Sequence, residues 1–410
     1  MPGHCQVIPV AVKVPAEMAK AVDPRRATPP LLKDLNERTV LETIRSAAPI
    51  SRAQISRRAG ISKPTVSLAL QSLLDAGLVR EATAEAGRPS YGATFFEPVA
   101  DAAFVLGLDL GARFLRGAVS DLSGEFSARQ DVEHKGADAD EALRLIVELR
   151  DTLLAAAGVP PDRLDGVVVG VPGMVERASG RVQLASNVSR LEGRDFGTEL
   201  GARLGAAVTL ENDINLAALG EQSRGIARGI DDFVFLSVGT GLGAGLVLGG
   251  ELHRGHHGAA GELDYALGAG HDAVDPCAQA ISELARDAAT RAPDSALTPP
   301  YDGRSIFAAA RAGDATALGV VEELAHRIAL HAAPIAAVAD VELVVLGGGL
   351  GANGDLLLEP VRALLGKWTP YPPRVEVSTL GEAAVLTGAV AVGISSARDN
   401  VFVNRVRAGG

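Results

Sequence analysis

The sequence has few cysteines and no long apolar run, and each absence excludes a class of protein. Only Cys5 and Cys277 occur among 410 residues, which rules out a disulfide framework and a CxxC zinc ribbon. No apolar run approaches the roughly 20 residues of a membrane helix, and the N-terminal segment lacks the apolar core of a secretory signal. We therefore expect a soluble cytoplasmic protein with no membrane partner.

Length, composition and charge indicate more than one domain. The chain is 47% hydrophobic and 22% charged, enough apolar residues for packed cores, and its length predicts two or three domains. The net charge of −11 shows that the whole molecule is not a basic nucleic-acid binder. However, residues 1–98 carry a net charge of +4 and the remainder −15. A basic N-terminal region joined to an acidic remainder suggests two regions with separate functions.

The front of the chain predicts a winged helix-turn-helix domain over residues 31–97, after a flexible tail at 1–30. A first helix ends at Pro49, and a capping box of Ser51 and Gln54 begins a second. Gly60 supplies the turn and Ser62 caps a third helix. Two short strands, at 78–80 and 93–96, enclose a turn at 84–90 and form the wing.

In such a domain the third helix enters the major groove, and its first residues face the base edges. The residues predicted to contact DNA are Ser62, Lys63, Thr65, Val66 and Ser67 on this helix, Arg88 at the wing tip, and Arg52 as a phosphate contact. The alternative is a helical hairpin whose basic face contacts proteins. The cap, the glycine turn and the basic wing together favour operator DNA as the partner.

Beyond residue 98 the pattern changes to short apolar strands alternating with helices, which predicts an α/β body. Strands are expected at 104–108, 115–120, 166–169, 208–210, 233–238, 243–248 and 343–346. Helices are expected near 138–157, 195–204, 213–225, 277–291, 314–338, 354–366 and 382–397. Residues 121–124 join two adjacent strands into a hairpin. A similar strand pair near 233–248 suggests a duplicated architecture.

Glycine-rich turns follow several of these strands, with Glu211-Asn-Asp213 between them. The turns begin at Asp109, Gly239 and Gly347, and such turns let backbone N–H groups approach phosphates. With Gly170-Val-Pro-Gly173 and the run from Gly258 to Glu262, they make the chain resemble the ROK family of repressors and sugar kinases. The resemblance covers about residues 30–398.

This resemblance implies a two-lobed actin-like (ribonuclease H-like) sugar-kinase fold with a sugar in the cleft. Lobe 1 would span 98–228 together with the helix 382–397, and lobe 2 would span 229–381. The winged domain is typical of the regulator branch of the family.

The resemblance also implies the ligand contacts. Asp213 matches the family's catalytic base, which accepts a proton from a sugar hydroxyl or, in a binding protein, anchors that hydroxyl. The other implied contacts are Asn187, Asn212, Glu262, Tyr265 and Gln279. Each has a structural alternative: Asp213 can cap a helix, Asn187 can belong to a turn, and Glu262 can be a solvated loop residue.

Several departures from the family pattern point away from catalysis. Gly111-Ala112-Arg113 replaces the kinase pattern Gly-Gly-Thr, Tyr265 replaces a histidine, and Cys277 alone remains of a cysteine-rich zinc loop. We therefore expect no bound metal, no cofactor and no enzymatic activity.

The resulting prediction is a transcriptional regulator of carbohydrate metabolism that binds DNA as a homodimer or a dimer of dimers. A sugar or sugar-phosphate effector would control it from the cleft. Two alternatives remain: an active ATP-dependent sugar kinase with an accessory DNA domain, and a regulator with a vestigial pocket controlled by a protein partner.

Overall fold

The computed structural model describes residues 29–82, 93–136, 138–185, 188–265 and 274–406. The chain forms two compact units, residues 1–99 with 405–410, and residues 100–404. None of the described helices is long and apolar enough to cross a membrane.

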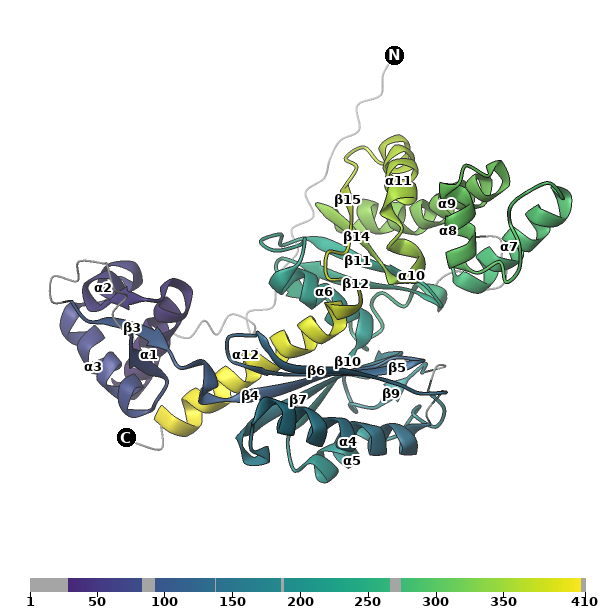
Figure 1. The fold of residues 1–410 in the computed structure, drawn as a ribbon. Coiled ribbons are helices and arrows are strands. Elements are labelled where there is room, and N and C mark those ends of the chain that lie inside the picture. The colour runs from purple at the N-terminus through teal and green to yellow at the C-terminus, as the bar shows by residue number, and fades with distance from the viewer. Residues whose placement is uncertain (1–28, 83–92, 137, 186–187, 266–273, 407–410) are drawn as a thin grey trace, which may run out of the picture. The chain divides into compact units, whose positions relative to one another are not determined.

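The described part of the first unit contains three helices and a small antiparallel sheet (Figure 1). The helices are α1 (Pro29–Ala47), α2 (Arg52–Ala59) and α3 (Lys63–Asp75). The strands β1 (Ile50–Ser51), β2 (Val79–Glu81) and β3 (Phe95–Pro98) pair in the order β1-β3-β2. This is the predicted winged helix-turn-helix, except that α1 begins inside the predicted tail, at Pro29, since proline is tolerated in a first helical turn.

Local sequence signals fix the ends of α2 and α3. Ser51 N donates to Gln54 Oε1 at 2.9 Å in the capping box that begins α2, and Gly60 ends this helix with a left-handed φ of 67°. Ser62 then accepts a hydrogen bond from Thr65 N at the start of α3. The predicted capping box, glycine turn and serine cap are therefore confirmed.

The core of this unit corrects one predicted DNA contact. Val66 has no exposed surface, and Leu70 and Leu73 on the same face of α3 are also buried. Val66 points inward because a helix turns by about 100° per residue, which brings positions 66, 70 and 73 to one side. The prediction that Val66 contacts bases was wrong, since it is a core residue.

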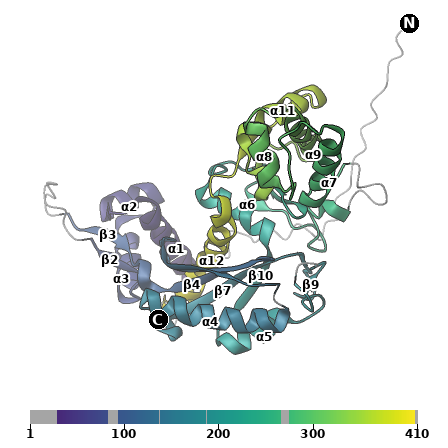
Figure 2. The ribbon, with the colours of Figure 1, turned by 45° about the vertical axis from the view of Figure 1, so that its right-hand side comes forward.

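Lobe 1 of the second unit is a five-stranded mixed sheet of order β10-β7-β4-β5-β6. Its strands are β4 (Phe104–Leu110), β5 (Phe114–Asp121), β6 (Phe126–Glu133), β7 (Leu164–Val171) and β10 (Val208–Asn212). Helices α4 (Ala139–Ala157) and α5 (Phe196–Leu204) cover one face, and α12 (Ala384–Val406) covers the other (Figures 1 and 2). A two-stranded sheet of β8 (Met174–Val175) and β9 (Val182–Gln183) extends this lobe.

Lobe 2 repeats the same plan. Its sheet order is β13-β12-β11-β14-β15, with β11 (Phe233–Val238), β12 (Leu242–Leu248), β13 (Glu251–Leu252), β14 (Leu343–Gly347) and β15 (Arg374–Val377). In both lobes the first strand pairs antiparallel with the second and parallel with a later one. The duplicated architecture that the sequence suggested is therefore confirmed.

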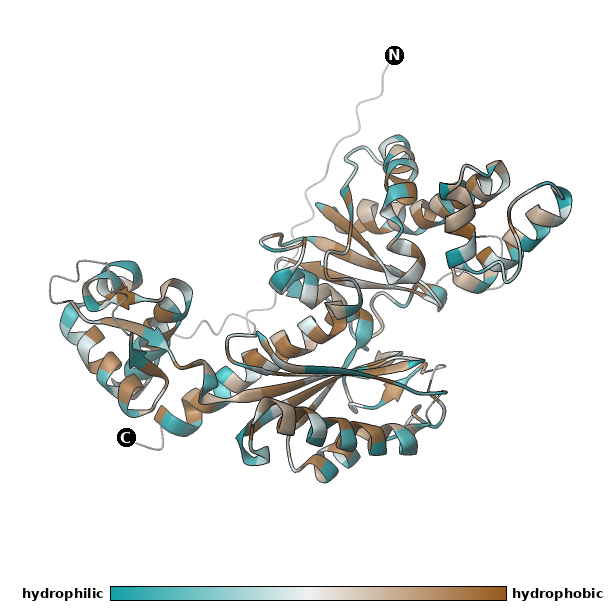
Figure 3. Cartoon of the chain, in the orientation of Figure 1, coloured by the Kyte–Doolittle hydropathy of each residue, from teal (hydrophilic) through white to brown (hydrophobic). Residues whose placement is uncertain are grey.

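Helices also cover both faces of the second sheet. The outer layer consists of α7 (Ala278–Arg291), α8 (Gly303–Arg311), α9 (Ala315–Ala339) and α11 (Gly354–Trp368), and α6 (Asp213–Arg224) covers the inner face. The short α10 (Gly348–Gly351) follows β14. Hydrophobic residues concentrate on the strands and on the helix faces against them (Figure 3).

Elements with a weak sequence pattern were not predicted. The hairpin predicted across residues 121–124 exists between β5 and β6, but β6 was not assigned because five of its eight residues are exposed and polar. The short strand β15 and the helix α8 were also missed. The described final helix is longer than predicted and runs to Val406.

Two glycines let α6 and α12 cross with their backbones in contact. A Cβ atom at Gly388 would overlap the carbonyl oxygen of Leu216, and one at Gly220 would overlap the carbonyl oxygen of Ala384. Because α6 lies on the sheet of lobe 2 and α12 on the sheet of lobe 1, this crossing fixes the two lobes against each other.

We therefore expect Gly388→Ala to lower the free energy of unfolding by about 3 kcal/mol, since the helices must separate to admit one methyl group. Gly319→Ala is the matched control, because this helical glycine in α9 has no atom within 4 Å of a built Cβ. It should stabilise the protein by roughly 0.5–1 kcal/mol. Urea denaturation measures both, and equal stabilities of Gly388→Ala and the wild type would contradict the close crossing.

Candidate functional site

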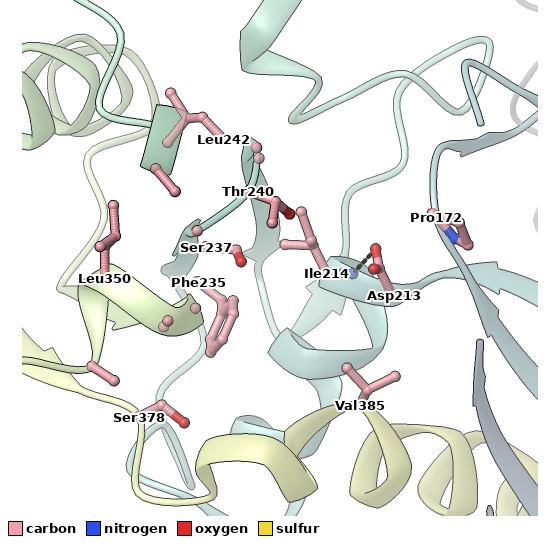
Figure 4. A pocket seen from close by; sticks show the side chains of 18 of the residues that line it. Pro172, Asp213, Ile214, Phe235, Ser237, Thr240, Leu242, Leu350, Ser378 and Val385 are labelled. Atoms are coloured by element: carbon pink, nitrogen blue, oxygen red, sulfur yellow. Dashed lines mark hydrogen bonds between the residues drawn. The ribbon is translucent and has the colours of Figure 1, made fainter. Parts of the chain in front are cut away.

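A cleft of about 1140 Å³ opens between the two lobes of the body. Lobe 1 contributes the ends of β4, β7 and β10, and lobe 2 contributes the loops after β11 and β14. Figure 4 shows Asp213 between Pro172 of lobe 1 and Thr240 of lobe 2. The cleft therefore brings together three of the sequence-predicted ligand contacts, Asn212, Asp213 and Glu262.

A buried hydrogen-bond network holds the turn that presents Asp213. Asn212 Oδ1 accepts from Asn215 N at 2.9 Å, and its Nδ2 donates to Gly173 O at 3.0 Å. The buried carboxylate of Glu211 accepts from Asn215 Nδ2 at 3.0 Å and from Arg254 Nε at 2.6 Å. The amide of Asn212 thus caps α6 and positions its neighbour.

Asp213 is the first residue of α6, and its Oδ1 accepts from Ile214 N at 2.9 Å. Burial raises its pKa to about 7, and the charges of Asp109 and Glu262 act in the same direction. A carboxyl group with this pKa exchanges its proton near neutral pH, which suits it either to accept a proton from a hydroxyl or to hold a hydroxyl by a hydrogen bond.

Two further cleft carboxyl groups also have raised pKa values, and their environments differ. Burial raises the pKa of Asp109 to about 6, although the neighbouring Arg116 guanidinium opposes this shift. Burial and the charge of Asp264 raise the pKa of Glu262. Three carboxyl groups with elevated pKa values in one cleft make it a strong candidate for a functional site.

Arg116 is a cleft residue that the sequence analysis did not single out. Its Nη1 lies 3.2 Å from Asp109 Oδ2, and its other nitrogens lie 3.5 Å from carboxylate oxygens of Asp131 and Glu382. The register of β4 and β5 places Asp109 directly opposite Arg116. Counting antiparallel partners outward from the turn at 111–113 would have revealed this pair. Arg113 also lines the cleft and pairs with Glu133.

The lobe 2 side of the cleft consists of backbone-rich loops and the start of α8. The loops are residues 239–243 and 347–349, and Asp302, Arg304, Arg311 and Asn353 also line this part. Both glycine loops were predicted from the sequence, but these four polar residues were not. Loops of this kind offer backbone N–H groups to phosphate oxygens.

The structure does not place the other three predicted ligand contacts, Gln279, Tyr265 and Asn187, in the cleft. Gln279 is exposed on α7, donates to Glu283 and lines a second pocket of about 560 Å³ that shares Thr240 and Asp264 with the cleft, so its contact with a sugar stays a prediction. Tyr265 ends a short 3-10 helix (Leu263–Tyr265), but its side chain and Asn187 lie outside the described residues.

In the described ranges, no three or more His, Cys, Asp or Glu side chains are arranged to hold a metal ion. Cys277 is buried, and its thiol lies 3.9 Å from Asp264 Oδ1. Burial raises the pKa of this thiol, which disfavours the thiolate that zinc requires. The donor set around Cys277 therefore does not fit a cysteine-rich zinc site.

The winged domain presents the predicted DNA contacts to different extents. Arg52, Ser62 and Lys63 are exposed, while Thr65 and Ser67 are half-buried. Arg88 lies outside the described residues. On the same outward face of α3 the structure also places Leu68 and Gln71, which the sequence analysis missed. Extending the helical period beyond the first turn would have found them.

The fold and the cleft together define a two-lobed, sugar-kinase-like body joined to a winged helix-turn-helix. The family model described as "ROK family" matches residues 105–396, and a MarR-family model matches residues 34–89. The chain therefore belongs to the ROK family, and it has the domain organisation of the family's transcriptional regulators.

The similar proteins include both repressors and sugar kinases. The xylose repressor of Caldicellulosiruptor bescii is 28% identical over 387 residues, which cover 89% of this chain and 96% of that protein. A glucokinase of Halalkalibacterium halodurans is 28% identical and matches 69% of this chain and 92% of its own length.

Solved structures agree on the fold. A ROK family transcriptional regulator, a homologue of the E. coli MLC protein, superposes with a TM-score of 0.77 over 92% of this chain and 99% of its own, at 23% identity. The ROK glucokinase of Streptomyces griseus, in complex with glucose and AMPPNP, has a TM-score of 0.60 at 26% identity over 71% of this chain and 99% of its own.

The raised pKa of Asp213 predicts a pH-dependent stability. The folded state keeps the proton up to about pH 7, whereas the unfolded chain releases it near pH 4. Rising pH therefore weakens folding through this group. We expect Asp213→Asn to be about 2 kcal/mol more stable than the wild type at pH 8, with the difference vanishing at pH 4. Urea denaturation at both pH values measures this, and the exposed Asp162→Asn should show no such pH dependence.

Proposed function

We propose that this protein is a sequence-specific DNA-binding regulator of carbohydrate metabolism whose cleft binds a sugar or sugar-phosphate effector. The observation that carries the proposal is the presence, in one chain, of an exposed helix-turn-helix and a kinase-like cleft that retains Asp213. The similarity to a xylose repressor along most of both chains supports it.

In this proposal α3 enters the major groove, and α2 lies across the DNA backbone. Lys63 is exposed at the first position of α3, where it reaches phosphate or guanine. Arg52, Arg57 and Arg58 are exposed on α2 and carry the sequence-independent part of the affinity. A homodimer then reads two half-sites related by a two-fold axis.

We expect the full chain to protect a palindrome whose half-sites lie a whole number of helical turns apart, about 10 bp or a multiple. Lys63→Ala should weaken binding roughly tenfold and reduce its salt dependence, since one phosphate or guanine contact is lost. Footprinting and fluorescence anisotropy at several salt concentrations measure this. Lys367→Ala, an equal charge change on the body helix α11, is the control and should leave DNA affinity unchanged. A single unpaired site with salt-insensitive binding would contradict the proposal.

In this proposal the effector acts through the cleft between the two lobes. A sugar hydroxyl donates a hydrogen bond to Asp213. This residue begins α6, and α6 contacts α12 of the other lobe through Gly220. Residues of both lobes line the cleft, so a ligand that touches both favours one lobe arrangement over another. Only such a difference in affinity can shift the equilibrium. The final helix α12 begins beside the cleft at Val385, and its last residues belong to the first unit.

We expect Asp213→Ala to lose the response of DNA binding to the effector while keeping operator affinity in its absence. A hydrogen bond to a charged group contributes about 1.5–3 kcal/mol, so effector affinity should fall tenfold or more. Anisotropy of labelled operator DNA, titrated with D-xylose, D-glucose and their phosphates, measures this.

Asp162→Ala, an exposed carboxylate outside the cleft, serves as the control for this titration. An unchanged response of Asp213→Ala would refute the site. A wild type that ignores the whole panel would favour control by a protein partner.

ATP-dependent phosphorylation of a sugar is the second candidate function. The two glycine loops and the pKa of Asp213 near 7 favour it, as does the similarity to a glucokinase. It ranks second because Arg116 pairs with Asp109 and because Ala112 and Arg113 alter the first loop. Phosphoryl transfer depends on positioning and charge stabilisation at these loops.

We therefore expect no turnover in a coupled assay with ATP, magnesium and a panel of hexoses and pentoses. A rate of about 1 per second or faster is typical of enzymes, and such a rate would establish the kinase and overturn the assignment as a regulator alone.

A further inference from the structure

The outward face of α3 carries one large apolar side chain that the fold leaves uncovered. Leu68 is 75% exposed, whereas Val66, Leu70 and Leu73 on the opposite face are at most 1% exposed. At about 100° per residue, Leu68 shares one side of the helix with the exposed Pro64 and Gln71, and Ser67 and Lys63 lie at the edge of that side. The side that a helix-turn-helix turns toward DNA is therefore part polar and part apolar.

The polar groups beside Leu68 already have hydrogen bonds within the helix. Ser67 Oγ donates to Lys63 O at 3.0 Å, and Gln71 Nε2 donates to Asp75 Oδ1 at 2.8 Å. At the start of the helix the hydroxyls of Ser62 and Thr65 bond each other at 2.8 Å. Leu68 has no such local role, since an exposed leucine neither caps the helix nor packs in the core.

The charge around this face indicates what covers it. Helix α2 contains three arginines and no acidic residue, and α3 begins with Lys63 and contains no acidic residue before Asp75. A surface with this excess of positive charge suits the phosphates of a duplex. Within the major groove, the 5-methyl group of thymine is the apolar feature of the base edges.

We propose that Leu68 is a specificity-determining residue that packs against the 5-methyl group of a thymine in each half-site. The inference rests on the proposed DNA-binding function. It specifies one base pair of the site, because each half-site contains a T·A pair at the position that Leu68 faces. The cations of α2 and Lys63 supply the phosphate contacts, and Leu68 discriminates between bases by apolar contact.

The test uses the full-length wild-type protein and a randomised duplex pool to select its binding site. Each thymine of the selected half-site is then replaced by uracil, which removes the methyl group and keeps every hydrogen-bonding atom. We expect one thymine per half-site at which uracil weakens wild-type binding about fourfold, the effect of one buried methyl-sized group. Leu68→Ala should bind the thymine and uracil duplexes equally at that position, with an unchanged salt dependence.

Leu35→Ala is the matched control, because Leu35 is a leucine of α1 that is 50% exposed in the same unit. It should keep the preference for thymine. The proposal is overturned if no thymine in the site prefers its methyl group, or if Leu68→Ala retains the preference. Enrichment of no sequence at all would instead refute DNA binding, and the proposal with it.

Discussion

The crossing of α6 and α12 is the constraint on which the body of this protein depends. Each helix lies on the sheet of a different lobe, and Gly220 and Gly388 allow their backbones to touch. Side chains at the crossing would separate the sheets and widen the cleft. Asp213 begins α6 and Val385 lies near the start of α12, so the same contact that joins the lobes sets the position of the cleft residues. The buried carboxylate of Glu221 strengthens this region by accepting hydrogen bonds from Ile226 N and Leu380 N.

Electrostatics give the two sides of the cleft different properties. Partial burial and neighbouring carboxylates raise the pKa values of Asp213 and Glu262, whereas Arg116 beside Asp109 opposes the rise in the pKa of that carboxyl group. A buried carboxyl group without a charged partner destabilises the folded state when ionised. A ligand hydroxyl that donates to Asp213 compensates for this cost, so occupancy of the cleft and stability of the body are coupled.

Much of the fold could be predicted from the sequence because its signals are local. The caps at Ser51 and Ser62 and the glycine at position 60 specify the helix-turn-helix, and apolar runs specify the buried strands. The exposed strand β6 lacked such a pattern. The error at Val66 arose because the direction of a side chain depends on helical phase and on tertiary packing rather than on its neighbours in sequence. The Asp109–Arg116 pair depends on strand register, which becomes visible only when the turn between the strands is placed.

The arrangement at Asp109 bears directly on the choice between regulator and kinase. A kinase needs its cleft carboxylates available to organise the phosphates and their metal ion. Here Arg116 pairs with Asp109 and also approaches Asp131 and Glu382. The shortest of these ion pairs engages the buried Asp109, whereas Glu382 is largely exposed. Because Arg116 is mostly buried, displacing it would leave a buried charge unpaired, which is costly. Binding a sugar at Asp213 requires no such displacement, and this difference supports the proposed regulator over the proposed kinase.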